Sequence, residues 1–214
     1  MRKSCLAVLS AALLIGTGCR SDPAAAPADE KLAELLDRAA RLQEAGRPLQ
    51  AAAQLGAAVH HAPDDAAVRH RLAEFYQSRK QWDAAEAEYR NALALETSTG
   101  TWLGLADLLR NRDRQPEAIR AYRSALALSP GSPRAGFGLC LAQVSHEDFA
   151  AAVDDCELGV RLNPQDVATR RHLGLALLRL ERYQEAAEVL LEGADFTPEQ
   201  RAEILRTLPP GKAE

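Results

Sequence analysis

Small and apolar residues recur along this chain with a period close to 34 residues. An alanine marks each period, followed four positions later by a larger apolar residue or a cysteine and seven positions later by another small residue. The marking alanines are Ala51, Ala85, Ala118, Ala152 and Ala186. Because offsets of four and seven place side chains on one face of an α-helix, the pattern predicts a repeated amphipathic helix.

Each period also contains a turn and a terminal break. The turns are expected near Ala45-Gly46, Arg79-Lys80, Arg112-Asp113, His146-Glu147 and Glu181-Arg182. Prolines that lack the amide hydrogen are expected to end the second helix of four units, at Pro63, Pro130, Pro164 and Pro198. No stretch alternates apolar and polar residues for long enough to predict a strand. The chain is therefore predicted to be all-α, with helix–turn–helix units at 32–65, 66–98, 99–132, 133–166 and 167–200.

This pattern resembles the tetratricopeptide repeat, a helical hairpin with a code of small and aromatic residues over 34 positions. The code is most complete in the third unit, with Trp102, Leu105, Ala106, Ala118, Tyr122, Ala125, Leu126, Leu128 and Pro130. The first unit is the weakest match, since Arg38 stands where a core leucine is expected. The resemblance implies a right-handed solenoid of about five hairpins over 31–208, with a capping helix at 201–208 and a tail at 209–214.

The N-terminus has the form of a targeting segment. Arg2 and Lys3 precede an apolar run, Leu6–Ile15, which is too short to span a membrane. The segment resembles a bacterial lipoprotein signal, in which Cys19 becomes the lipidated first residue. This resemblance implies a signal peptide at 1–18 and a flexible tether at 19–30.

A second interpretation of this segment stays open. Lipoprotein signals usually have leucine three places before the cysteine, and this chain has Gly16 there. Ordinary signal-peptidase cleavage near Ala24–Ala28 would instead release a soluble periplasmic protein.

The composition and the missing motifs argue against several classes of function. The chain has 26 Lys and Arg against 30 Asp and Glu, a net charge of −4, which is not the charge of a nucleic-acid-binding protein. It contains no phosphate-binding loop, zinc-protease motif or serine-hydrolase motif. The cluster of His60, His61 and His70 is better explained as a solvated helix end than as a metal site, because adjacent histidines point in different directions on a helix. We therefore predict no enzymatic activity, no cofactor and no metal.

Two cysteines remain once Cys5 and Cys19 are assigned to the leader and the lipid. Cys140 and Cys156 fall on the two helices of the fourth unit, and an antiparallel hairpin places them roughly opposite each other. In an oxidising compartment they could form a disulfide. The alternative is a pair of buried free thiols that act as small apolar fillers.

The resemblance also implies a binding surface, because in the family the first helix of each hairpin lines an inner groove. The positions that match it here are Leu103, Asp107, Arg110, Phe137, Leu141, Arg171, Leu175 and Leu178, preceded by His70 and Glu74 in the second unit. The lysine and asparagine set with which some members hold a C-terminal carboxylate is missing. A partly apolar groove edged by arginines is expected to bind an amphipathic helix or an apolar peptide.

These observations predict a non-enzymatic scaffold or adaptor of the bacterial cell envelope, attached to a membrane only through its N-terminal lipid and facing the periplasm. Similar lipoproteins support the assembly of larger complexes such as pilus or secretion machinery. A soluble periplasmic chaperone or protease adaptor is the alternative, and a metal-binding or enzyme-associated protein is less favoured. The weak first repeat is a candidate surface for a homodimer.

Overall fold

The computed structural model describes residues 26–192, 197–207 and 209. This part of the chain folds into eleven α-helices without strands, which confirms the predicted all-α solenoid. The helices are α1 (Ala26–Glu44), α2 (Pro48–His61), α3 (Ala66–Ser78), α4 (Trp82–Leu95), α5 (Thr99–Asn111), α6 (Gln115–Leu128), α7 (Pro133–Ser145), α8 (Phe149–Leu162), α9 (Val167–Arg179), α10 (Tyr183–Leu191) and α11 (Pro198–Thr207).

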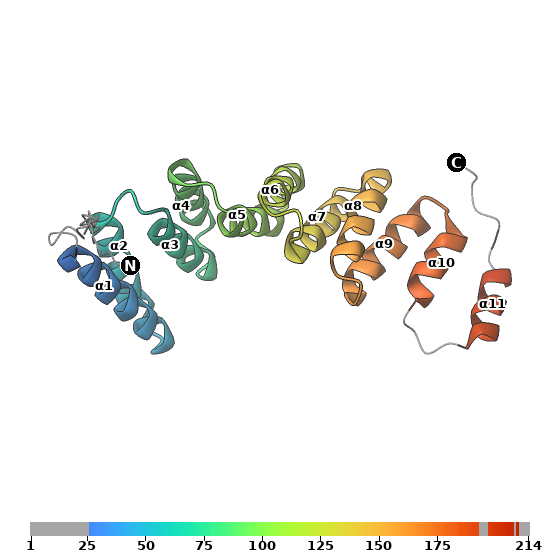
Figure 1. Cartoon of the computed structure of the whole chain (residues 1–214), viewed down its shortest axis with the longest axis horizontal. Coiled ribbons are helices and arrows are strands. Elements are labelled where there is room, and N and C mark those ends of the chain that lie inside the picture. Colours follow the sequence, from blue (N-terminus) through green and yellow to red (C-terminus); the bar gives the residue numbers. More distant parts are fainter. Residues whose placement is uncertain (1–25, 193–196, 208, 210–214) are drawn as a thin grey trace, which may run out of the picture.

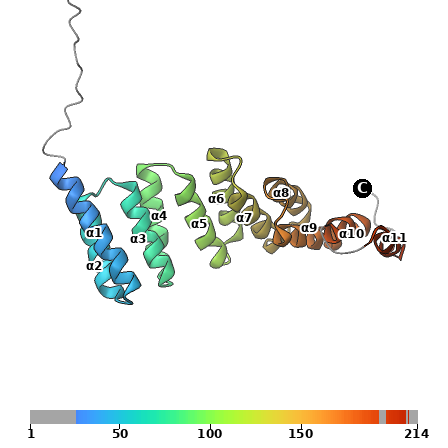
Figure 2. The ribbon, with the colours of Figure 1, turned by 60° about the horizontal axis from the view of Figure 1, so that its bottom comes forward.

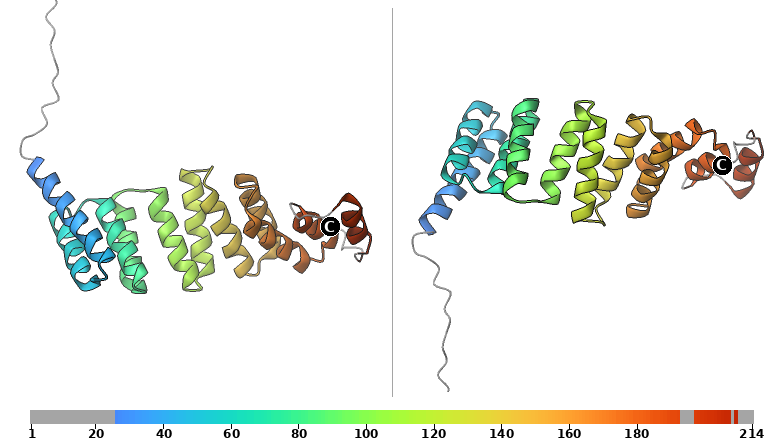
Figure 3. Two further views of the ribbon diagram at one scale, coloured as in Figure 1. Left: turned by 90° about the horizontal axis from the view of Figure 1, so that it is seen from below. Right: turned by 90° about the horizontal axis from the view of Figure 1, so that it is seen from above.

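The helices pair into hairpins that follow one another in a row (Figure 1). Each odd-numbered helix up to α9 packs against the next helix in the chain and also against the second helix of the preceding hairpin where one exists. Figure 2 shows that the helix axes change direction along the row, so the array twists. Figure 3 shows the hairpins side by side from below and from above. Each hairpin therefore buries its apolar stripe only against its neighbours.

Polar side chains cap the N-terminus of the first helix in the second, third, fourth and fifth hairpins. Asp65 accepts hydrogen bonds from the amides of Ala67 and Val68 at 2.8 and 3.1 Å, and Asp166 caps α9 in the same way. Ser98 and Ser132 occupy the equivalent places before α5 and α7. These caps satisfy amides that have no partner inside the helix, which sets where each hairpin begins.

The turns within the hairpins lie where they were predicted, and each contains one residue with a left-handed backbone. These residues are Gly46, Lys80, Asp113, Glu147 and Glu181, with φ between 57° and 66°. Directly after Lys80, the amide of Gln81 donates to the carbonyl of Tyr76 at 2.9 Å. This hydrogen bond, which spans five residues, is the one that defines a Schellman motif. Four non-glycine residues thus adopt a conformation that glycine accepts more readily, because the same turn is needed in every unit.

The marking alanines form the centre of the hydrophobic core, as the period predicted. All of them are completely buried. Larger core side chains such as Tyr89, Tyr122, Leu108 and Leu139 fill the space between successive hairpins. The alanines allow the two helices of a hairpin to approach closely, and the larger residues join one hairpin to the next.

Several boundaries differ from the prediction. α1 already begins at Ala26, so residues 26–30 are helical rather than part of the tether. α10 ends at Leu191, and Pro198 does not close it but opens α11, where the missing amide hydrogen costs little. The terminal helix thus starts three residues before the predicted cap at 201–208, and it packs against α10.

The predicted leader lies outside the described residues, and so does Cys19. Among the helices that are described, none combines the length and the apolar character that crossing a membrane requires.

Candidate functional site

The first helices of successive hairpins, α3, α5, α7 and α9, lie next to one another and form one face of the array. We call this surface, together with α1, the first-helix face. Arg171, Leu175 and Leu178 of α9 are exposed on it, with 41% of each leucine accessible. Phe137 and Leu141 of α7 are half-buried. The C-terminal part of this face is thus partly apolar, as the sequence suggested.

Leu103 is not part of this exposed set. Only 6% of its surface is accessible, because it joins the core that contains Ala73 of α3 and Tyr89 of α4. Its predicted place in the groove is therefore wrong. An aliphatic side chain gains free energy from burial wherever neighbouring helices can cover it, and here they do.

Asp107 is the centre of a polar network in the middle of the face. Its Oδ1 accepts a hydrogen bond from the Tyr122 hydroxyl at 2.5 Å, and its Oδ2 lies 2.5 Å from Nη2 of Arg134. Nε of Arg110 donates to the Tyr122 oxygen at 3.2 Å. Burial and the nearby carboxylate of Asp107 raise the pKa of Tyr122, so its hydroxyl keeps its proton. The charges predicted at Asp107 and Arg110 are thus already engaged within the protein.

His70 and Glu74 form a second polar group, next to the first. Nε2 of His70 lies 3.3 Å from Oε1 of Glu74, and its Nδ1 lies 3.1 Å from Oγ1 of Thr101. The hydrogen bond from His70 lowers the pKa of Glu74, and the charges of His70, Arg134 and Arg71 act in the same direction against the effect of burial. Glu74 is therefore a stable carboxylate on this face.

Two tyrosines reach the face because glycines on the next hairpin make room for their rings. A Cβ atom at Gly104 would lie 2.6 Å from the Tyr89 ring, and one at Gly138 would lie 2.2 Å from the Tyr122 ring. The Tyr89 hydroxyl donates to Gln77 on α3 of its own hairpin at 2.6 Å. A side chain at either glycine would displace the ring.

The other two junctions combine different residues at the equivalent positions. Between the first and second hairpins, Leu55 replaces the tyrosine and Arg71 replaces the glycine. Between the fourth and fifth hairpins these positions hold Cys156 and His172, and the ring of His172 contacts Phe137 with 6.2 Å between centroids. Where no tyrosine crosses the junction, a larger residue stands opposite.

Two hollows lie on the first-helix face. The larger, about 920 Å³, is bounded by α1, the start of α2 and α3, and Leu36, Ala40, Leu55, Arg71 and Phe75 line it. The smaller, about 340 Å³, extends toward Arg134 and is lined by His70 and Tyr89. Both are lined by Glu74 and Ser78, so the two hollows adjoin each other, and we call them together the trough.

This trough lies over the first three hairpins rather than over the predicted site residues of α7 and α9. Of the residues that line it, the sequence had singled out only His70 and Glu74. The sequence signal that could have indicated the trough is Arg71, which stands at the junction position that is glycine in the next two hairpins.

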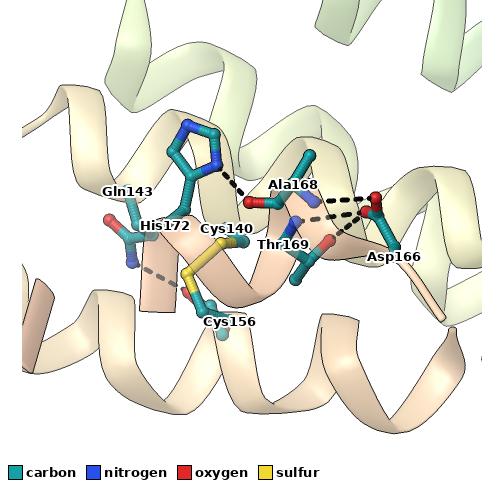
Figure 4. The surroundings of a disulfide bond; sticks show 8 residues. Cys140, Gln143, Cys156, Asp166, Ala168, Thr169 and His172 are labelled. Atoms are coloured by element: carbon teal, nitrogen blue, oxygen red, sulfur yellow. Dashed lines mark hydrogen bonds between the residues drawn. A yellow bond between two sulfur atoms is a disulfide. The ribbon is translucent and has the colours of Figure 1, made fainter. Parts of the chain in front are cut away.

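Cys140 and Cys156 are joined by a disulfide between α7 and α8 (Figure 4), with their Cα atoms 4.4 Å apart. Both residues are completely buried, and they pack in a cluster with Leu173 of α9. Of the two alternatives that the sequence left open, the structure contains the disulfide.

The described residues include no group of three or more His, Cys, Asp or Glu side chains placed to hold a metal ion. His60 and His61 are both exposed at the end of α2.

Models described as tetratricopeptide repeats match residues 42–98, 99–144 and 137–200. Among curated proteins, the E3 ubiquitin-protein ligase CHIP of Arabidopsis thaliana is 30% identical over 85 residues, which is 40% of this chain and 31% of the ligase. The chain therefore spans less than a third of the length of that relative.

Solved structures resemble the fold over most of the chain. MamA of Desulfovibrio magneticus RS-1 superposes with a TM-score of 0.69 at 19% identity, covering 78% of this chain and 98% of that one. PilF of Pseudomonas aeruginosa superposes with a TM-score of 0.65 at 21% identity, covering 84% of this chain and 86% of that one. At such identities the likeness establishes the fold alone.

Proposed function

Since this chain belongs to the tetratricopeptide repeat family, we propose that it is a scaffold of the bacterial cell envelope that holds partner proteins while a larger complex is assembled. Its repeats make it a protein–protein interaction scaffold of a fold that is generally non-catalytic. The proposal concerns the place where it works and the surface that it uses.

The observation that carries the proposal is the trough of two adjoining hollows on the first-helix face, together with the exposed apolar residues of α9. The trough of two hollows runs from α1 to Arg134 of α7. Beyond it, Leu175 and Leu178 are exposed beside Arg171. A rigid surface of this kind can bind a peptide or a helix while only the partner loses conformational freedom.

The internal ion pairs of the face also suit a holding surface. Asp107 is paired with Arg134, and Oε1 of Glu74 lies 3.3 Å from Nε2 of His70, so both carboxylates already have partners within the protein. Such pairing keeps the side chains of the face in place before a partner arrives, which reduces the entropy cost of binding.

The proposed anchor is a lipid on Cys19, with a soluble periplasmic protein as the alternative. Cys19 precedes the first residue of α1 by seven positions. A chain of that length reaches at most roughly 25 Å. The lipid would therefore hold the first hairpin, with the larger hollow, close to the membrane surface.

Crosslinking and affinity purification from bacterial envelopes test the scaffold. We expect Leu175→Glu combined with Leu178→Glu to remove partners, because both side chains are exposed and the change does not disturb the core. Phe137→Glu with Leu141→Glu extends the test to α7. Leu95→Glu combined with Leu128→Glu is the matched control, since it places the same two charges on similarly exposed leucines at the ends of α4 and α6. An unchanged set of partners in both groove variants would refute binding at this part of the face.

Membrane fractionation tests the anchor separately. Cys19→Ala should move the protein from the membrane to the soluble fraction and abolish labelling by radioactive palmitate. Continued membrane association of this variant would exclude the lipid anchor without affecting the scaffold.

A further inference from the structure

The junction between the first two hairpins is open, unlike those that follow. α3 packs against α5, α5 against α7 and α7 against α9, but no Cα atom of α1 lies within 8 Å of one in α3. The hollow of about 920 Å³ lies between α1 and α3. The two hairpins stay joined lower down, where Leu55 packs with Leu72 and Phe75.

The residues at the junction explain why it is open. In the next two junctions a tyrosine ring crosses to the following hairpin and fills the space above a glycine. Leu55 is too short to cross in this way, and the side chain of Arg71 stands where the glycine would be. The absence of a ring at Leu55 and the additional side chain of Arg71 together keep α1 and α3 apart. Leu55 and Arg71 both line the hollow.

The hollow combines an apolar base with a positive rim. Leu55 and Phe75 are almost completely buried at its base, with Leu36 of α1 opposite. Arg71 and Arg79 line it and are exposed, and neither forms an ion pair with any residue that the structure describes. Glu74, the only carboxylate in the lining, is held by His70 at 3.3 Å. Two guanidinium groups against one carboxylate leave the lining with an excess of positive charge, which favours an anionic group next to an apolar one.

The shape of the trough indicates a chain rather than a single small molecule. The hollow adjoins the smaller one at Glu74 and Ser78, and that second hollow is lined by polar groups such as Gln77 and Arg134. A fatty acyl chain would place its methylene groups against these polar side chains. A peptide can place one apolar side chain in the larger hollow and continue with its backbone along the polar part.

We propose that the hollow between α1 and α3 is the anchor pocket for the partner peptide, and that it takes a large apolar side chain flanked by aspartate or glutamate. This inference rests on the proposed scaffold function and names the site and the partner chemistry. It places the main anchor over the first two hairpins, and the exposed leucines of α9 outside it.

Fluorescence anisotropy with synthetic peptides tests the pocket. The probe is a fluorescein-labelled peptide of sequence Gly-Ser-Glu-Leu-Phe-Asp-Glu-Ser-Gly. One comparison peptide has alanine in place of leucine and phenylalanine, and a second has lysine in place of every acidic residue. We expect the purified protein to bind the probe and to bind each comparison peptide at least about tenfold more weakly, a difference of roughly 1.4 kcal/mol.

Variants locate the site. Ala40 is exposed in the lining of the hollow, so Ala40→Trp should fill the space and weaken probe binding at least tenfold, as should Arg71→Glu. The matched controls are Ala94→Trp on α4 and Arg120→Glu on α6, both at exposed positions away from the hollow. Unchanged far-ultraviolet circular dichroism would show that the variants remain folded.

Each outcome decides between the two proposals. Loss of binding in Leu175→Glu with Leu178→Glu, but not in Ala40→Trp, would overturn the anchor pocket and leave the scaffold intact. Preference for the lysine peptide, or displacement of the probe by laurate but not by unlabelled peptide, would overturn the partner chemistry. Absence of probe binding up to about 1 mM would also overturn it, and the envelope crosslinking would then show independently whether the scaffold function survives.

Discussion

The ring of Tyr122 on α6 occupies the space that a side chain at Gly138 on α7 would need, since a Cβ atom there would lie 2.2 Å from the ring. The two residues belong to different hairpins. The ring thus packs against the next hairpin, while the tyrosine hydroxyl donates to Asp107 on α5 of its own hairpin. A core contact and a polar contact on the first-helix face thus depend on the same glycine.

Gly138→Ala should therefore destabilise the protein, although alanine is the better helix former. In an open helix the exchange would stabilise by up to about 1 kcal/mol, but overpacking against a buried ring costs about 1–3 kcal/mol. Urea unfolding measures the change. Gly56→Ala on α2 is the control and should stabilise, because a Cβ atom there would meet nothing within 4 Å. Equal shifts of both midpoints in the stabilising direction would contradict the close contact.

Glu86 on α4 should be one of the most sensitive charged residues. It is almost completely buried and lies 2.7, 3.1 and 2.6 Å from guanidinium nitrogens of Arg90, Arg112 and Arg114. Glu86→Ala should cost about 1–3 kcal/mol, because three arginines lose a shared partner. Thermal unfolding provides the comparison with Glu157→Ala, whose exposed pair with Arg161 should contribute less than about 0.5 kcal/mol. A similar effect of both changes would show that the network does not stabilise the junction.

Glu74 should make the stability depend on pH in the acid range. The hydrogen bond from His70 lowers its pKa from the ordinary value of 4.5. Because the folded state favours the carboxylate, this stabilisation is present above about pH 4.5 and is lost as the pH falls through the lowered pKa. Urea midpoints measured between pH 6 and pH 3 should fall less steeply for Glu74→Gln than for the unchanged protein. Parallel curves would exclude a contribution from this group.

The disulfide between Cys140 and Cys156 should remain in protein purified without reductant. Mass spectrometry after proteolysis should find the two cysteine-containing peptides linked. Closing a loop with a sequence separation of 16 should stabilise by about 3 kcal/mol in the chain-entropy model. The double variant Cys140→Ala with Cys156→Ala should therefore unfold at a lower urea concentration. Two alkylatable thiols at these positions in the untreated protein would show that the bond does not form in the cell.

Local features of the chain were sufficient to predict the repeat and the turns within its hairpins. Ala118 and its equivalents lie on one helical face at a constant period, and the buried centre of each hairpin follows from that spacing. The turn around Asp113 could be placed for the same reason, since each hairpin repeats the same local backbone. Pro198 was misplaced because proline is compatible both with the end of one helix and with the first turn of the next.

The sequence by itself determined the family of folds, the number of hairpins and the placement of Cys140 and Cys156 on facing helices of one hairpin, because these depend on residues close together in one unit. Only the tertiary structure decided that Leu103 is covered, and that the trough lies over the first three hairpins. These properties depend on pairs from different units, such as Leu55 with Arg71 and Tyr122 with Gly138. Whether two helices touch or leave a hollow depends on the combined size of the side chains at their junction, and neither residue of the pair reveals it alone.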